Sequence, residues 1–189
     1  MHRIKASIQQ LINISDTELE VFTEKMHIKT FSKNDFICRP GEPADEIYFI
    51  NKGLLRLLIT DNAGNDISVH FALENQFLAD YSSFILKEKT AYFIQAIEES
   101  EIVIIPRSAI EWGYRNLKEG EKMGRLIAEH YFIYQDNRVK DMYARSPKER
   151  YDNITEIFPN IHNRVPQHMI ASYLGISSVH LSRLKKGAH

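Results

Sequence analysis

The alternation of apolar and polar residues divides the chain into segments of different periodicity. Over residues 3–26 the apolar positions recur at helical spacing, and Ser15 with Glu18 forms a capping box that starts a second short helix. From His27 to Pro106 the pattern changes to short runs rich in β-branched and aromatic residues, separated by turn sequences. Many short strands at this spacing predict an antiparallel barrel, sandwich or roll.

A helical stretch follows the predicted strands. Residues 108–144 contain no proline and predict one long connecting helix. Ser146, Pro147 and Glu149 then supply the N-cap, the first position and the third position of a new helix. The sequence therefore predicts an α+β chain. Its expected domains are a β domain with N-terminal helices at 1–107, the connecting helix at 108–144, and a small helical domain at 145–189.

The formal net charge of −1 hides an uneven distribution of charge. Residues 138–189 hold nine Lys and Arg against four acids, and no acid follows Glu156. A basic end on an otherwise acidic chain is typical of a segment that binds a polyanion. A solvated run of surface charge would look the same, so charge alone leaves both interpretations open.

The basic end also carries a motif. Residues 165–186 contain two helical halves around Gly175, which can adopt the left-handed conformation of a turn. Ala171, Gly175, Leu181 and Leu184 match the spacing of a helix-turn-helix, whose second helix enters the major groove of DNA. An ordinary helical hairpin is the alternative, and the acid-free, basic surroundings favour DNA. The predicted DNA-binding residues are Gln167, Ser177, Ser178, Val179, His180, Ser182, Arg183, Lys185 and Lys186.

Several classes of protein are disfavoured by what the sequence lacks. Cys38 is the only cysteine, which argues against a disulfide framework and against a zinc knuckle. We find no phosphate loop, nucleophile elbow or His-Glu-x-x-His motif, so we expect neither an enzyme nor a metal site. There is no apolar run long enough to span a bilayer and no signal peptide pattern, so we expect a cytoplasmic protein without membrane contact.

The stretch "ICRPGEPADEIYFINKG", residues 37–53, combines Gly41-Glu42, a small Ala44, four consecutive apolar residues and Gly53. It resembles the signature of the cyclic nucleotide-binding domain. With the long helix and the helix-turn-helix, the whole chain resembles the Crp/Fnr family of bacterial transcription regulators. This resemblance implies an antiparallel β-roll (double-stranded β-helix) as sensor, a homodimer joined through the long helix, and double-stranded DNA and RNA polymerase as partners.

The expected nucleotide pocket departs from the family pattern. Nucleotide-binding members present a Gly-Glu pair and an Arg-Ser pair, where this chain has Ala79-Asp80 and Lys89-Thr90. Lys is a point charge that cannot replace the two-pronged Arg at a phosphate. We therefore expect no cofactor and weak or no cyclic-AMP binding, with either a different small-molecule effector or an empty structural pocket. The predicted pocket residues are Ala79, Asp80, Tyr81, Ser82, Lys89 and Thr90. His27 and His70 are interpreted as strand residues rather than haem ligands.

The predicted dimer contacts on the long helix are Met123, Ile127, Tyr131 and Tyr134, although packing on the chain's own β domain would give the same spacing. Only residues 187–189 follow Lys186, so we expect no β-hairpin wing after the second helix of the motif. A second hypothesis is a sensor or adaptor whose C-terminal helices bind protein. That function needs exposed apolar residues in the last helix, where only Val179 qualifies.

Overall fold

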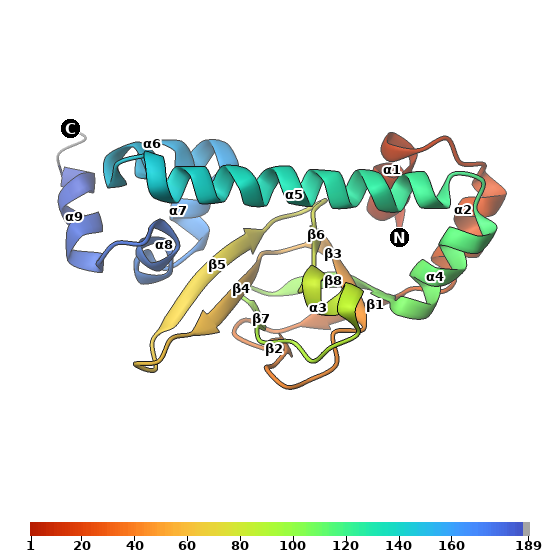
Figure 1. Cartoon of the computed structure of the whole chain (residues 1–189), viewed down its shortest axis with the longest axis horizontal. Helices are drawn as coiled ribbons and strands as arrows, with labels where there is room; N and C mark the ends of the chain where they lie inside the picture. Colours follow the sequence, from red (N-terminus) through yellow and green to blue (C-terminus); the bar gives the residue numbers. More distant parts are fainter. Residues whose placement is uncertain (187–189) are drawn as a thin grey trace.

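The computed structural model describes residues 1–186, and its core is a β-roll beside a long helix (Figure 1). The strands are β1 (His27–Phe31), β2 (Phe36–Cys38), β3 (Glu46–Lys52), β4 (Leu55–Thr60), β5 (Asp66–Ala72), β6 (Phe77–Leu78), β7 (Phe93–Ala96) and β8 (Ser100–Pro106). The helices are α1 (His2–Leu11), α2 (Asp16–Thr23), α3 (Tyr81–Leu86), α4 (Arg107–Asn116), α5 (Gly120–Ala144), α6 (Pro147–Ile157), α7 (Ile161–Arg164), α8 (Gln167–Leu174) and α9 (Ser178–Lys186).

The strands form two four-stranded antiparallel sheets. Their strand orders are β1-β8-β3-β6 and β2-β7-β4-β5. Apolar side chains such as Ile50, Leu57 and Ile94 are buried together inside the roll, which hides the apolar surface of both sheets from water. The predicted α+β architecture with an antiparallel roll is therefore confirmed. Within residues 1–186, no helix has the length and apolar character needed to cross a membrane.

The stretch that we predicted as one helix is two helices, so this part of the prediction is wrong. α4 ends at Asn116 and α5 begins at Gly120, with Leu117 extended and buried between them. A Cβ atom on Gly120 would collide with the carbonyl oxygen of Gly113, so the two helices meet at their backbones. The helix breaks where the two helices pack closely at Gly113 and Gly120. No proline in the sequence marks this break.

α5 runs along the roll, from α1 and α2 at one end to the C-terminal helices at the other (Figure 1). The four predicted dimer contacts face inward. Met123 is buried, Ile127 packs against the same core, the ring of Tyr131 lies 5.5 Å from that of Tyr81, and Tyr134 bonds to His70. Met123 is thus used in the chain's own core, and the other three side chains are half-buried against the roll, the alternative that their spacing left open. Their role as dimer contacts stays a prediction. The exposed large apolar side chains of α5 are Phe132, Ile133, Val139, Met142 and Tyr143.

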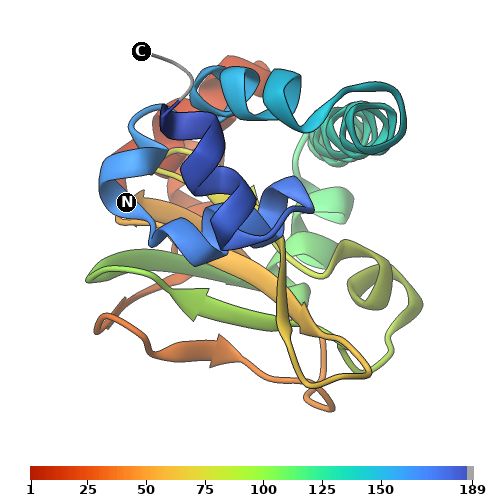
Figure 2. The same cartoon turned by 90° about the vertical axis from the view of Figure 1, so that its left-hand side faces the viewer.

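The C-terminal helices form a unit that packs against β5 (Figures 1 and 2). Phe158, the residue after α6, and Tyr173 of α8 lie within one apolar cluster with Leu54, Phe71 and Ile97 of the roll. The turn between α8 and α9 falls at Gly175, whose φ of +68° lies in the left-handed region, as predicted. The expectation that no wing follows concerns residues 187–189, which lie outside the described residues.

Candidate nucleic-acid interface and sensor pocket

The helix α9 has one buried residue, Leu181, and one half-buried residue, Leu184, and presents its other side chains to solvent. Leu181 is 1% exposed and belongs to the apolar cluster of the C-terminal unit. Ser177 precedes the helix, and its hydroxyl accepts a hydrogen bond from the backbone N–H of His180 at 3.2 Å. The predicted face is exposed. Its exposed members are Ser177, Ser178, Val179, His180, Ser182, Arg183, Lys185 and Lys186.

The cations on α9 differ in what they contact. The Lys185 ammonium donates to the side-chain oxygen of Gln167 at 3.3 Å, which links α9 to the first turn of α8. Arg183 and Lys186 form no ion pair with any residue in the described range 1–186. α8 and α9 contain no acidic residue. The surface thus offers free donors and positive charge beside small side chains.

Hydrogen bonds between α8 and β5 fix the position of this surface relative to the roll. The Ser172 hydroxyl accepts from the backbone N–H of Ser68 at 2.9 Å and donates to the carbonyl of Asp66 at 3.1 Å. Arg138 of α5 lies 3.8 Å above the ring of Tyr173 and donates to the backbone carbonyl of that residue. α8 is therefore held from two sides, by a strand of the roll and by α5.

A second link joins α7 to the roll through charge. The Arg164 guanidinium donates two hydrogen bonds to the Glu74 carboxylate, at 2.8 and 3.0 Å, and also donates to Glu98. These bonds to Glu74 and Glu98 raise the pKa of Arg164 above its usual value. Burial alone would raise the pKa of Glu74. The hydrogen bonds from Arg164 and from the Gly53 backbone outweigh burial, so the pKa of Glu74 is below its usual value. Nothing in the local sequence around Arg164 signals this partnership.

The predicted sensor pocket centres on a buried carboxylate. The Asp80 side chain accepts from the Thr90 hydroxyl at 2.8 Å, from the Ser82 hydroxyl at 2.9 Å and from the Ser83 backbone at 3.2 Å. Burial raises the pKa of Asp80, but the hydrogen bonds from Ser83, Thr90 and Ser82 outweigh burial and lower it. Asp80 and Thr90 are both buried, so these two groups satisfy each other inside the roll.

The other predicted pocket residues do not converge on Asp80. Lys89 is exposed, and its backbone pairs with that of Pro43 in an isolated β-bridge. Ala79 is buried in the apolar core between the roll and α1. Tyr81 is half-buried and stacks on Phe84 as well as against α5. The structure therefore brings Asp80, Ser82 and Thr90 together but leaves the one cation of the predicted set in solvent.

The sequence model of the family described as "Cyclic nucleotide-binding domain" matches residues 28–116. This segment, which runs from β1 to α4, is therefore similar to a cyclic nucleotide-binding domain. Among curated relatives, a "Global nitrogen regulator" of Nostoc sp. is 29% identical over 100 residues, which cover 53% of this chain and 44% of the relative. The "cAMP-activated global transcriptional regulator CRP" of Salmonella typhimurium is 24% identical over 91 residues, which cover 48% of this chain and 43% of the relative. The chain thus spans less than half the length of the curated relatives it matches.

Solved structures share the fold over most of the chain. FixK2 from Bradyrhizobium japonicum has a TM-score of 0.74 at 15% identity, covering 87% of this chain and 84% of FixK2. A protein described as a transcriptional regulator of the crp/fnr family, from Eubacterium rectale, has a TM-score of 0.70 at 13% identity, with coverage of 92% and 82%. The cyclic nucleotide-binding domain, its relatives and this shared fold confirm the resemblance to the Crp/Fnr family.

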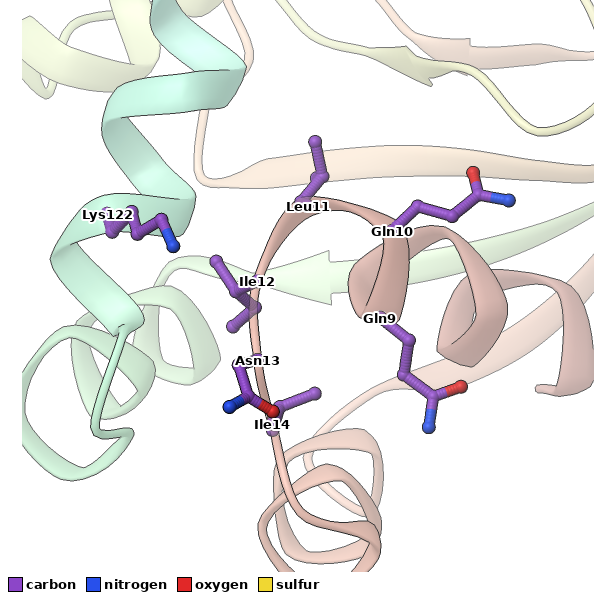
Figure 3. A pocket seen from close by; sticks show the side chains of 7 residues that line it. All are labelled: Gln9, Gln10, Leu11, Ile12, Asn13, Ile14 and Lys122. Carbon is purple, nitrogen blue, oxygen red and sulfur yellow. The ribbon is translucent and has the colours of Figure 1, made fainter.

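A shallow hollow lies outside the cyclic nucleotide-binding domain, between α1, the segment after it and the start of α5 (Figure 3). It has a volume of about 410 Å³ and shares no residue with the predicted sensor pocket. Its one charged side chain, Lys122, pairs with Glu119 at 2.9 Å. Since the lysine already has a partner and the remaining lining is neutral, this hollow carries no functional assignment.

Proposed function

We propose that this chain is a sequence-specific, DNA-binding transcription regulator of the Crp/Fnr type, which acts in the cytoplasm as a homodimer and catalyses no reaction. One observation supports DNA binding above the others. α9 is anchored by buried Leu181 and turns an exposed, acid-free face with unpaired Arg183 and Lys186 toward solvent. Such a face has the size and the donors that the major groove of DNA accepts.

Each group on the face has a role in this proposal. Arg183 carries two parallel donors that fit O6 and N7 of guanine, and Ser178 and Ser182 have hydroxyls for base or phosphate. Val179 is 62% exposed and suits the methyl group of thymine. Lys186, at the end of the helix, is a point charge suited to phosphate. Base reading is therefore assigned to Arg183 and backbone attraction to Lys186.

The exposed apolar face of α5 supports a dimer. Phe132 and Val139 lie seven residues apart and Met142 three further on, which is the spacing of a helix–helix seam. Exposed side chains of this size at heptad spacing are costly in water and are covered when two copies meet. A symmetric pair would place its two α9 helices about 34 Å apart, at successive major grooves.

For the sensor, we propose that the pocket beside Asp80 does not bind cyclic AMP, although the relative CRP is named as activated by it. The Asp80 carboxylate is already bonded to Thr90 and Ser82, and Lys89 points into solvent. A cyclic phosphate placed there would meet a carboxylate and no buried cation. Control by a different small molecule fits these contacts better. RNA polymerase is the further partner that family resemblance suggests.

A protein-binding role for the C-terminal helices is the competing hypothesis. It requires an exposed apolar surface on α9, and Val179 is the one large apolar residue of that helix exposed in the described range. DNA is therefore favoured over a protein partner.

Titration of labelled random-sequence duplex DNA at two salt concentrations tests the proposal. Because phosphate contacts release counterions, we expect affinity to fall at least tenfold between about 50 and 200 mM salt. Lys186→Ala should flatten this dependence, and Lys148→Ala, on α6, serves as a control with the same loss of charge. Absence of binding at the lower salt concentration would overturn the proposal and favour the protein-binding alternative.

A further inference from the structure

A second, larger cavity lies where the roll, α5 and the C-terminal helices meet. It has a volume of about 760 Å³, which is within the range of small-molecule sites. Its walls come from α1 (Ser7), from β5 and β6 (His70 and Phe77), from α5 (Ile127) and from the end of α6 (Ile157). It shares no residue with the predicted pocket at 79–90, so it is a separate feature of the fold.

The chemistry of the walls selects a class of ligand. Phe77, Leu126, Ile127, Ile133 and Phe158 give the cavity a largely apolar surface, and neutral polar side chains such as Gln10 and Gln76 also line it. Among residues 1–186, no Lys or Arg lines it. Its one acid, Glu129, is paired with Arg125 at 2.6 Å. The lining also includes His130. An anion such as a nucleotide would find no permanent positive charge among these residues, whereas a neutral molecule with an apolar body would be desolvated at little cost.

His70 supplies a fixed polar group at the wall of this cavity. Its Nδ1 lies 2.6 Å from the Tyr134 hydroxyl, which sets the orientation of the ring. The other ring nitrogen, Nε2, forms no hydrogen bond within residues 1–186. Nε2 is accessible to solvent. Burial of the ring, and after it Arg138, lowers the pKa of His70 to about 3, so the imidazole is neutral. One uncharged ring nitrogen is thus available to a ligand.

We propose that this cavity is a binding site for a small, neutral, amphipathic molecule with an apolar body and one hydrogen-bonding group that meets His70. The site touches both halves of the chain. Tyr134, which lines it, lies 3.2 Å from the Tyr173 hydroxyl of α8, and Phe158 belongs to the C-terminal cluster. The site goes beyond the proposed function, because it exists whether or not α9 binds DNA.

The dye Nile red, which is neutral and amphipathic, serves as the probe in a fluorescence titration of the full chain. We expect saturable binding of one dye per chain. Ile133→Trp, on α5, and Gln10→Trp, on α1, enlarge two side chains that line the cavity, and each should weaken binding at least tenfold. Ile85→Trp, on α3, is the matched control, since Ile85 is 57% exposed and Ile133 58%; it should stay within twofold of the unaltered protein.

Two results would overturn the site: no saturable binding by the unaltered chain, or equal binding by the two cavity variants and Ile85→Trp. Both cavity substitutions are at exposed positions, and thermal unfolding checks that each variant is folded. The same proteins are titrated with random duplex DNA. If the unaltered chain binds DNA but shows no saturable dye binding, only the proposed cavity site is overturned. If it binds the dye but not DNA, only the proposed function is overturned.

Discussion

Arg164 and Glu74 form a two-pronged ion pair, at 2.8 and 3.0 Å, between α7 and the segment that follows β5. Glu98 contacts the same guanidinium, so one cation holds two carboxylates of the roll. The side chains of Arg164 and Glu74 are 21% and 29% exposed, which makes this pair less screened than those on the surface. The pair ties the C-terminal helices to the roll.

Arg164→Ala should lower the free energy of unfolding by about 1–3 kcal/mol, because it leaves two neighbouring carboxylates without their shared partner. Urea titration measures this, and hydrogen exchange should show earlier opening of α8 amides. Lys148→Ala breaks an exposed pair with Asp152 and should cost no more than about 0.5 kcal/mol. Equal effects of the two substitutions would show that the link between α7 and the roll contributes nothing special.

His70 should make the chain less stable in mild acid. Its pKa is about 3 in the fold, against about 6.5 in an unfolded chain, so below pH 6.5 only the unfolded state takes up the proton. Between pH 7 and pH 5 this removes about 2 kcal/mol from the free energy of unfolding. Over the same pH range, the free energy of unfolding of His70→Gln should fall by about 2 kcal/mol less than that of the unaltered protein. If plots of this free energy against pH run parallel for the two proteins, His70 titrates normally in the fold.

The local structure was largely predictable, because it depends on neighbours in sequence. The capping boxes at Ser15 and Ser146 are present, and Gly175 makes the turn of the motif. The short strands of the roll follow from alternation and turn residues. In these cases the pattern and the interaction lie within a few residues of each other.

The long-range contacts were not predictable from the sequence. Helical spacing showed that Tyr131 and Tyr134 share a face, but spacing does not reveal whether the chain's own roll or a second copy covers that face. The same limit applies to Arg164, whose partners lie 90 and 66 positions away. The break between α4 and α5 depends on close packing at Gly120, which is a tertiary effect.

Substitution of the exposed α5 face should dissociate the dimer. Val139→Asp places a charge in the seam and should shift sedimentation at micromolar concentration from a dimer to a 22.0 kDa species. Ile28→Asp is the control, because Ile28 is a comparably exposed apolar residue on β1, away from α5. A monomer without any substitution, or a dimer that tolerates Val139→Asp, would contradict the assigned seam.

Cyclic AMP should bind weakly or not at all. Calorimetry of the unaltered chain is expected to give no constant tighter than about millimolar, since Asp80 and Thr90 satisfy each other and Lys89 is exposed. A variant that combines Ala79→Gly, Asp80→Glu, Lys89→Arg and Thr90→Ser restores the family pattern and should bind more tightly. Micromolar binding by the unaltered chain would show that these four residues do not prevent recognition.

The central claim, that α9 reads DNA sequence, is tested most directly by comparing Arg183→Ala with Lys186→Ala on two DNAs. The first DNA is a duplex selected from a random library by the unaltered protein, and the second is random duplex. We predict that Arg183→Ala costs about 1–3 kcal/mol on the selected duplex only and relaxes the preference at one base pair per half-site. Lys186→Ala should weaken both DNAs alike. An equal loss on both DNAs for Arg183→Ala would contradict base reading by this residue.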